Sequence, residues 1–283
     1  MVSTIGLVSP GAMGSAVGRT LTEKGHSVLA VLDGRSGATR GRAAAAGIKA
    51  VGTLEELVGS ADLVLSIVPP AAAVDVATEV ADAIEGAGVA PLVVDANAVS
   101  PATARTIASL VEAAGARFVD GDIIGGPPRA GLVTALYLSG PDAVSVADTL
   151  DTPELHAVSI GTDQAAASAL KMCYAAWTKG TSALLLSIRA MARAEGVEGA
   201  LLDAWKASLP DIVTRSEGTV NVAPKAWRSV AEMEEISATF EGAGLPPQWG
   251  QAMAEVYRRL SSYKDVDTPP PLDELLAALT RQA

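Results

Sequence analysis

The sequence is poor in the residues that bind metals or form disulfides. Its 283 residues include one cysteine, Cys173, and two histidines, His26 and His156. A single cysteine excludes an internal disulfide. With so few cysteines and histidines, we expect neither a zinc site nor a serine-histidine triad. We therefore predict no metal site. Aromatic residues form only 4% of the chain against 49% hydrophobic residues, so the cores should be built from small, tightly packed side chains.

Positive charge and long apolar runs are also scarce. The formal net charge of -11 disfavours a nucleic-acid partner, because binding a polyanion needs a basic surface. No apolar run approaches the roughly 18 to 20 residues that span a bilayer, and the first residues lack the basic region of a signal peptide. We expect a cytoplasmic protein with a small-molecule substrate and no membrane partner. The length suggests about two domains.

Short apolar runs alternate with helical patterns in the first half of the chain. Strand-like runs lie at residues 4–8, 27–32, 63–68 and 91–96, with helical patterns between them. The run LVLSIV is apolar at nearly every position, as in parallel strands that helices cover on both faces. The alternation predicts an α/β fold with an N-terminal Rossmann-type doubly wound sheet.

The pattern changes after HAVSIGTD, residues 156–163, where strand signals stop and a long helical stretch rich in alanine and leucine begins. Asp163 is a candidate cap for this helix, and Gly196 a candidate end. We therefore predict a domain boundary between residues 161 and 162, with domains at 1–161 and 162–283. The second domain should be all-α.

The turn after the first predicted strand resembles a dinucleotide-binding fingerprint. In TIGLVSPGAMGSAVGRTL, residues 4–21, Gly11 and Gly14 match the glycines that admit a pyrophosphate and allow close helix-strand packing. Ser9 replaces the first glycine of the fingerprint, and Pro10 stiffens the turn. The N-terminal amides of the next helix would face the pyrophosphate. The alternative is an ordinary strand-to-helix turn.

Charged residues beyond the second strand bear on the choice of cofactor. Asp33 follows Gly14 by about nineteen residues, which is the usual place of an acid that binds the ribose hydroxyls. Arg35, Ser36 and Arg40 come next, and guanidinium and hydroxyl groups there could hold a 2′-phosphate. This favours NADP. If the arginines are instead a solvated helix start, Asp33 favours NAD.

Five segments together resemble the β-hydroxyacid dehydrogenase superfamily, the group of 3-hydroxyisobutyrate and 6-phosphogluconate dehydrogenases. They are GLVSPGAMG for the G-x-G-x-M-G turn, SIVPP for the fourth-strand loop, DANAVSPATAR for D-x-S-T-x-S-P, DGDIIGGPPRAG for D-A-P-V-S-G-G and ASALKMCYAAWTKG for the catalytic-lysine helix. The C-terminal segments look like a subgroup with a distinct phosphogluconate-dehydrogenase-like C-terminal domain.

The resemblance implies an NAD(P)-dependent oxidoreductase that acts on a small hydroxy acid or carbonyl compound. It also implies a homodimer, an active site between the domains, and Lys171 as the proton-transfer residue. The cofactor contacts are expected from Ser9, Pro10, Gly11, Ala12, Met13, Gly14, Asp33, Arg35, Ser36, Arg40, Val68, Pro69 and Asn97. The substrate contacts are expected from Ile124, Gly125, Gly126, Ala175 and Lys179.

Three polar groups of the family pattern are replaced in this chain. Ile124 stands for a serine, Asn97 and Ala98 stand for a serine-threonine pair, and Ala175 stands for an asparagine. The pocket should therefore be more apolar than usual, with backbone amides at the two glycines of the substrate loop left to bind an oxygen. We do not expect plain 3-hydroxyisobutyrate to be the substrate.

Lys171 carries the predicted chemistry. A lysine ammonium is a poor base unless burial lowers its pKa, so we expect desolvation by Leu170, Tyr174 and Trp177. Helical spacing places Tyr174 on the face of Lys171, which makes it a second candidate proton donor. Lys179 lies about 80° around the helix and should meet the domain interface or a substrate phosphate. The alternative is that Lys171 extends its ammonium into water.

Other residues have structural alternatives. Asn97 is a candidate for orienting the nicotinamide carboxamide and Arg129 for pairing with an anionic substrate, while Asp120 is expected to bond its own turn. The tryptophans Trp177, Trp205 and Trp227 are predicted core residues. Two other functions stay open: an imine reductase, which usually lacks a lysine at this position, and a non-catalytic NADP-binding sensor.

Overall fold

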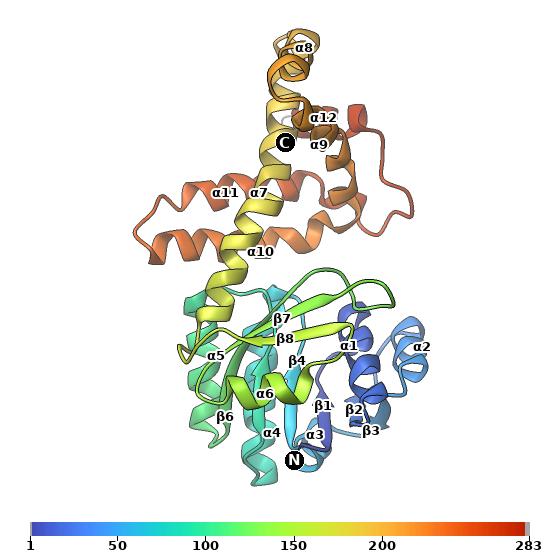
Figure 1. Cartoon of the computed structure of the whole chain (residues 1–283), viewed down its shortest axis with the longest axis vertical. Helices are drawn as coiled ribbons and strands as arrows, with labels where there is room; N and C mark the ends of the chain where they lie inside the picture. The colour runs from blue at the N-terminus through green and yellow to red at the C-terminus, as the bar shows by residue number, and fades with distance from the viewer. Residues whose placement is uncertain (1, 281–283) are drawn as a thin grey trace. The chain divides into compact units, whose positions relative to one another are not determined.

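A computed structural model describes residues 2–280, and its first compact unit is built on one eight-stranded sheet. The strands are β1 (Thr4–Leu7), β2 (Ser27–Val31), β3 (Lys49–Val51), β4 (Leu63–Ser66), β5 (Leu92–Asp95), β6 (Arg117–Ile124), β7 (Thr134–Ser139) and β8 (Leu155–Ser159). They lie in the order β3-β2-β1-β4-β5-β6-β7-β8 (Figure 1). Strands β1 to β6 are parallel, and β7 is antiparallel to β6. The order of the first six is that of dinucleotide-binding folds, so the predicted Rossmann-type sheet is confirmed.

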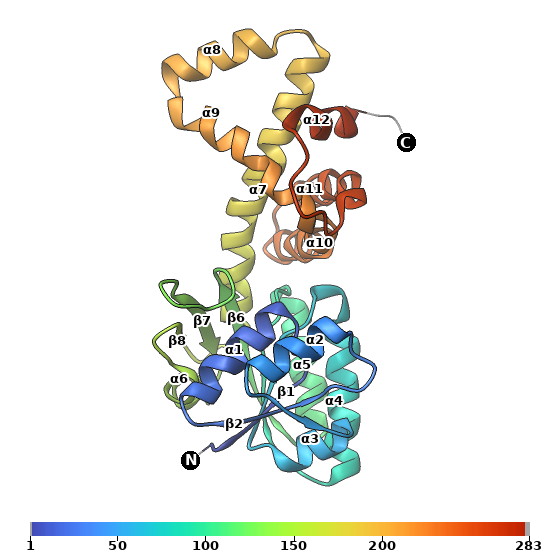
Figure 2. The same ribbon diagram turned by 90° about the vertical axis from the view of Figure 1, so that its right-hand side faces the viewer.

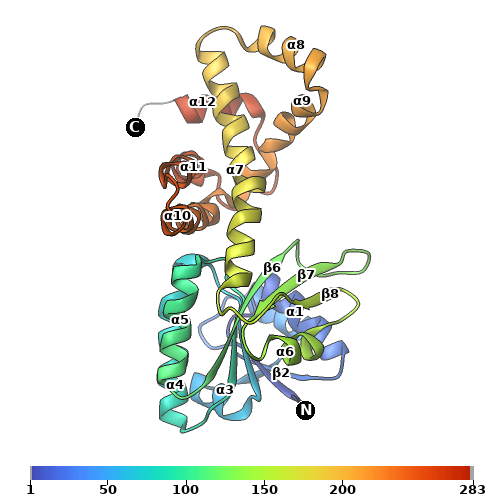
Figure 3. The same ribbon diagram turned by 60° about the vertical axis from the view of Figure 1, so that its left-hand side comes forward.

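Helices cover both faces of the sheet, which explains its apolar strands. On one face lie α1 (Ala12–Glu23), α2 (Gly37–Ala45) and α6 (Ala143–Leu150); on the other lie α3 (Leu54–Ser60), α4 (Ala73–Ala87) and α5 (Pro101–Ala113) (Figure 3). Each set of helices shares a hydrophobic core with the strands. Every residue of β4 and β5 is buried, as expected for strands with two covered faces.

The second compact unit begins at Met172, inside the long helix α7 (Ala166–Ala194). The predicted boundary at residue 161 stays a prediction. The later elements are α8 (Glu198–Ser208), α9 (Pro210–Glu217), η2 (Gly218–Lys225), α10 (Ala226–Gly242), α11 (Gln248–Arg259), η3 (Ser261–Tyr263) and α12 (Leu272–Thr280). The predicted all-α character is confirmed. Between residues 2 and 280, no helix combines the length and the apolar character that a membrane crossing requires.

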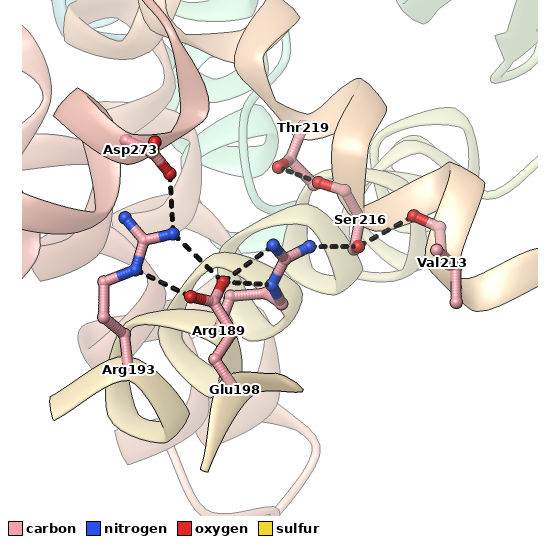
Figure 4. A network of polar contacts seen from close by, with 7 residues as sticks. All are labelled: Arg189, Arg193, Glu198, Val213, Ser216, Thr219 and Asp273. Carbon is pink, nitrogen blue, oxygen red and sulfur yellow. Dashed lines mark hydrogen bonds and ion pairs between the residues drawn. The ribbon is translucent and has the colours of Figure 1, made fainter. Parts of the chain in front are cut away.

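Close packing and a buried polar network hold the helical unit together. Helices α10 and α11 run side by side (Figure 1), and a Cβ atom added at Gly250 would lie 2.5 Å from the Ser237 nitrogen. Helices α8 and α9 form a hairpin (Figure 2). Arg189 of α7 donates to Glu198 of α8 at 2.8 Å and to the Ser216 hydroxyl of α9 at 2.9 Å (Figure 4). The close backbone contact at Gly250 therefore holds α11 against α10, and the side chain of Arg189 holds α7 against α8 and α9.

A second arginine completes this network. Arg193 donates to Glu198 at 2.8 Å and to Asp273 of α12 at 2.6 Å (Figure 4). Hydrogen bonds from Arg193 and then from Arg189 hold the pKa of Glu198 below its usual range, against the opposing effect of burial. Glu198 therefore stays a carboxylate that joins helices α7 and α8.

The tryptophans correct one expectation. Trp177 is 65% exposed, with the Arg215 guanidinium 5.4 Å from its ring centroid, so its assignment to the core was wrong. Trp205 and Trp227 are half-buried. The Trp227 ring lies between two cations, with Arg228 at 4.8 Å and Lys264 at 4.3 Å from its centroid. Cation-π contact, rather than core burial, accounts for two of these rings.

Candidate cofactor loop and active site

The turn between β1 and α1 has the geometry of a phosphate-binding loop. The Ser9 carbonyl accepts a hydrogen bond from the Gly11 amide at 2.9 Å, and a Cβ atom at Gly14 would lie 2.2 Å from the same oxygen. Only glycine fits at position 14. A Cβ at Gly11, in contrast, would meet no atom within 4 Å, and the first turn of α1 carries no acidic residue. Open backbone before a helix N-terminus fits a dinucleotide diphosphate.

The residues after β2 lie on the surface. Asp33, Arg35, Ser36 and Arg40 are all exposed. The Ser36 hydroxyl accepts from the Thr39 amide at 3.2 Å and so caps α2, while the Arg40 guanidinium donates to the Arg35 carbonyl at 2.7 Å. Ser36 and Arg40, two of the predicted 2′-phosphate contacts, therefore stabilise this loop. Arg35 lies in the same loop and is exposed.

Asn97 links the ends of β4 and β5. Its Oδ1 accepts from the Val68 amide at 2.6 Å, and its Nδ2 donates to the Ser66 hydroxyl at 3.1 Å and to Asp95 at 2.5 Å. Asn97 is buried, and these bonds use both of its amide hydrogens. Its contact with a nicotinamide stays a prediction, because the observed bonds instead position Val68 at the start of the loop that contains Pro69.

Two buried carboxyl groups lie on the neighbouring strands β5 and β6, close to the carboxyl end of β5. Asp95 of β5 and Asp120 of β6 are register partners. Burial, reinforced by the charge of Asp120, raises the pKa of Asp95 to about 8, and the Oδ2 of Asp95 accepts no hydrogen bond from residues 2–280. Burial also raises the pKa of Asp120 to about 6, against hydrogen bonds from Ser168 and Ser139 that oppose the shift.

Asp120 fixes the start of α7. Its carboxylate accepts from the Ser168 amide at 2.9 Å and from the Ser168 hydroxyl at 2.6 Å, while the Ser139 hydroxyl accepts from the Ala167 amide at 3.0 Å. Asp120 is thus structural, but it bonds a helix 48 residues away rather than its own turn. These bonds satisfy amides in the first turn of α7 and so set the position of Lys171, one turn later.

Lys171 is paired with a buried carboxylate in the same compact unit. Its Nζ lies 2.7 Å from Asp122 Oδ1 and donates to the Ile123 carbonyl at 2.6 Å. The exposed fractions of the two side chains are 14% for Lys171 and 2% for Asp122. The contacts of the ammonium are therefore one carboxylate and one carbonyl at the end of β6.

The desolvation of Lys171 by its apolar helical neighbours stays a prediction, and the observed contacts of the ammonium are with other residues. Leu170 is 36% exposed, Tyr174 48% and Trp177 65%. Asp122, which sequence reasoning missed, is the residue in contact. A signal was present: Asp120 and Asp122 are two positions apart, so in a strand they share one face. Asp122 also stands where the resembling motif has a proline.

The predicted substrate residues lie in different surroundings. Ile124 is half-buried at the end of β6, and Gly125 has a φ of 124°, which glycine adopts readily. The Gly126 carbonyl accepts from the Thr134 hydroxyl at 2.6 Å. Ala175 is buried in α7. Lys179 forms an ion pair with the buried Glu232 of α10, so the observed bond of Lys179 lies inside the helical unit and its contact with substrate stays a prediction.

Two family models match the chain. Residues 3–151, more than half of the sequence, match the NAD binding domain of 6-phosphogluconate dehydrogenase. Residues 192–260 match a family described as a domain of unknown function (DUF1932). The first match covers strands β1 to β7 and the glycine turn, and the second covers most of the helical unit.

Individual proteins are similar over long stretches. An uncharacterized 28.5 kDa protein of Methanothermus fervidus is 30% identical over 201 residues, which are 70% of this chain and 74% of that protein. The mitochondrial 3-hydroxyisobutyrate dehydrogenase of Drosophila melanogaster is 31% identical over 136 residues, or 48% of this chain and 41% of that protein. The crystal structure of a conserved hypothetical protein from Sinorhizobium meliloti has a TM-score of 0.71 at 25% identity, covering 99% of this chain and 96% of that one.

Proposed function

From the finding that this chain belongs to the β-hydroxyacid dehydrogenase superfamily, we propose that it moves a hydride between NADP and a small hydroxy acid or carbonyl compound, with Lys171 transferring the proton. An NAD(P)-dependent oxidoreductase of the hydroxyacid dehydrogenase type is what the family supports. The preference for NADP, the kind of substrate and the role of the lysine are our proposals. The observation that carries the role of the lysine is the contact of Lys171 with the end of β6, inside the unit that holds the glycine turn.

The topology of the sheet supports a shared site. Strands β1, β4, β5 and β6 are parallel neighbours, so the glycine turn, Val68, Asn97 and Ile123 all follow or lie near the carboxyl ends of strands at one edge. Ligands of open α/β sheets bind outside that edge. A cofactor diphosphate at Gly11 and a substrate near Lys171 would therefore lie along one edge of the sheet.

Arg35 is the proposed main contact of a 2′-phosphate. The observed bonds of Ser36 and Arg40 fix the loop beside it, so the guanidinium of Arg35 is presented by a backbone already held in place. A guanidinium matches a phosphate through paired hydrogen bonds, whereas the hydroxyls of NAD offer it no anion. Asp33 would in turn contact a ribose hydroxyl.

Lys171 is the proposed donor or acceptor at the substrate oxygen. A lysine ammonium has three N–H donors, and two of them are used by Asp122 and Ile123. The third would reach the hydroxyl or carbonyl oxygen, and the amides of Gly125 and Gly126 would orient the rest of the substrate. The roles of Tyr174, Ala175 and Lys179, the homodimer and the cytoplasmic location stay predictions.

Binding experiments on glycine variants test the cofactor site. Gly11→Ala adds a methyl group where the protein leaves open space, so the fold should be kept while the approach of a diphosphate is blocked. We expect the affinity for NADPH, measured by calorimetry, to fall at least about tenfold, or roughly 1.4 kcal/mol. Gly86→Ala, in open space on α4, is the matched control and should bind as the wild type does. Equal binding by both variants would place the diphosphate elsewhere.

The two other candidate functions make different predictions in the same assays. An imine reductase would consume NADPH with cyclic imines but not with hydroxy acids or ketones, and the apolar Ile124 in place of a serine favours that reading. A non-catalytic sensor would bind NADPH with the same dependence on Gly11 but consume it with neither class of compound. A panel of carbonyl compounds, hydroxy acids and imines separates the three.

A further inference from the structure

Asp122 is the charged partner of Lys171, and the two groups form a nearly buried pair. The Asp122 side chain is only 2% exposed, and its Oδ1 lies 2.7 Å from the lysine Nζ. A carboxylate this buried is stable when a cation and hydrogen bonds compensate it. The pairing is between side chains 49 positions apart, so it depends on the fold and not on local sequence.

The other carboxyl groups at this edge do not compete for the ammonium. Asp120 bonds Ser168 and Ser139, and Asp95 bonds Asn97. Burial also raises the pKa of Asp95 to about 8, so near neutral pH this carboxyl group is mostly protonated, whereas Asp120, with a pKa of about 6, is held by its own hydrogen-bond donors. Asp122 is therefore the carboxylate of this cluster that contacts the Lys171 ammonium, while Asp120 and Asp95 bond other groups.

We propose that Asp122 is a positioning residue that holds Lys171 as an ammonium with one N–H directed to the substrate, so that the resting site donates a proton and is set for reduction. This inference rests on the proposed function. Asp122 and the Ile123 carbonyl take two of the three donors, which fixes the ammonium and leaves one N–H for a ligand. Asp122 itself would not touch the substrate.

The chemistry of the reducing direction follows from this arrangement. As the carbonyl carbon gains a C–H bond and two electrons from the reduced nicotinamide, the C=O π bond breaks and the oxygen takes a proton from Nζ. The N–H bond of Lys171 breaks, and its amine regains a proton from solvent, since 14% of the side chain is exposed. Oxidation would instead start from a neutral amine, and that would leave the buried Asp122 carboxylate without its cation.

Amine labelling of the cofactor-free protein tests the pairing directly. Acylation by an N-hydroxysuccinimide acetate near neutral pH modifies only neutral amines, and mass spectrometry measures the rate at each lysine. In Asp122→Asn we expect the rate at Lys171 to rise at least about tenfold, because an opposite charge in contact is lost. Lys49, an exposed lysine of the same unit, is the internal standard. An unchanged rate at Lys171 would overturn the proposal.

Two further variants separate charge from loosened structure. Asp122→Glu keeps the charge and should label as slowly as the wild type. Asp120→Asn removes bonds at the start of α7 but leaves Asp122 in place, and it should also leave Lys171 slow. If Asp120→Asn accelerates labelling as much as Asp122→Asn, the effect is structural and the proposal fails.

The protonation of Lys171 can also be measured in the wild type, so this test does not depend on whether a variant of Asp122 folds. In the nitrogen NMR spectrum of lysine-labelled protein, with the Lys171 signal assigned by its loss in Lys171→Arg, Nζ should have the shift of an ammonium near neutral pH. A neutral amine there would overturn the proposal. None of these readouts requires cofactor, so failure of NADPH to bind would count against the proposed function and leave the pairing intact.

Discussion

The buried carboxyl group of Asp95 should make the stability of the sheet unit fall as the pH rises. Its pKa is raised to about 8 by burial and by the charge of Asp120. An unfolded aspartate has a pKa of about 3.9, so between these values the folded state holds a proton that the unfolded state has released. The stabilisation is fully present below about pH 4 and is lost progressively as the pH approaches 8.

The magnitude follows from linkage. One proton difference changes the free energy of unfolding by about 1.36 kcal/mol per pH unit. Between about pH 6 and pH 8 the difference for Asp95 falls from about one proton to one half, which gives a loss of about 2 kcal/mol. Asp120, whose pKa is about 6, adds a few tenths of a kcal/mol over this range. Asp95→Asn should remove most of this slope.

Urea denaturation followed by circular dichroism at the two pH values measures the slope. Asp82→Asn, an exposed position on α4, is the matched control and should keep the wild-type slope. The four tryptophans all lie beyond residue 172, so their fluorescence follows the helical unit separately. The Oδ2 of Asp95 has no hydrogen-bond partner among residues 2–280, so the amide group that replaces it would also be left with an unpaired polar atom. The test is therefore the slope and not the absolute stability. Equal slopes in Asp95→Asn and wild type would refute the reasoning.

Three other perturbations have defined outcomes. Gly14→Ala places a Cβ atom 2.2 Å from the Ser9 carbonyl, so unfolding in urea should show a loss of about 1–3 kcal/mol, and a wild-type midpoint would contradict the packing. Arg35→Ala should weaken NADPH at least about tenfold while sparing NADH; equal losses in calorimetry would contradict the 2′-phosphate assignment. Glu232→Gln leaves the Lys179 ammonium without its partner carboxylate and should destabilise the helical unit by about 1–2 kcal/mol, seen in tryptophan fluorescence, whereas an unmoved transition would argue against a structural pair.

The parallel part of the sheet was predictable because its strands are uniform apolar runs. Strands β4 and β5 are buried at every position, and the runs that predicted them are apolar for that reason. Strand β6 was not recognised as a strand. Its sequence RFVDGDII holds two aspartates and a glycine, which interrupt the apolar signal. In the fold, helix α7 and strand β7 supply hydrogen bonds that compensate the burial of these aspartates.

The glycine turn of the site was predictable from the sequence, whereas the contact between Lys171 and Asp122 was not. The glycine turn is local, so its fingerprint can be read from adjacent residues, and Gly14 is required by a contact five positions away. The lysine was found through resemblance to a family. Its partner Asp122 lies 49 positions earlier, and no local pattern links the two. The same limit explains Trp177, which was predicted to be a core residue but lies on the surface beside Arg215.

The most direct test of a lysine-dependent oxidoreductase is the consumption of NADPH by the wild type and by Lys171→Met, across the panel of carbonyl compounds. Methionine keeps most of the volume of the side chain but removes the proton donor. The account predicts turnover by the wild type with at least one carbonyl compound and a loss of about 100-fold or more in kcat in the variant, the usual contribution of a general acid. Turnover that survives the substitution would contradict the role of Lys171.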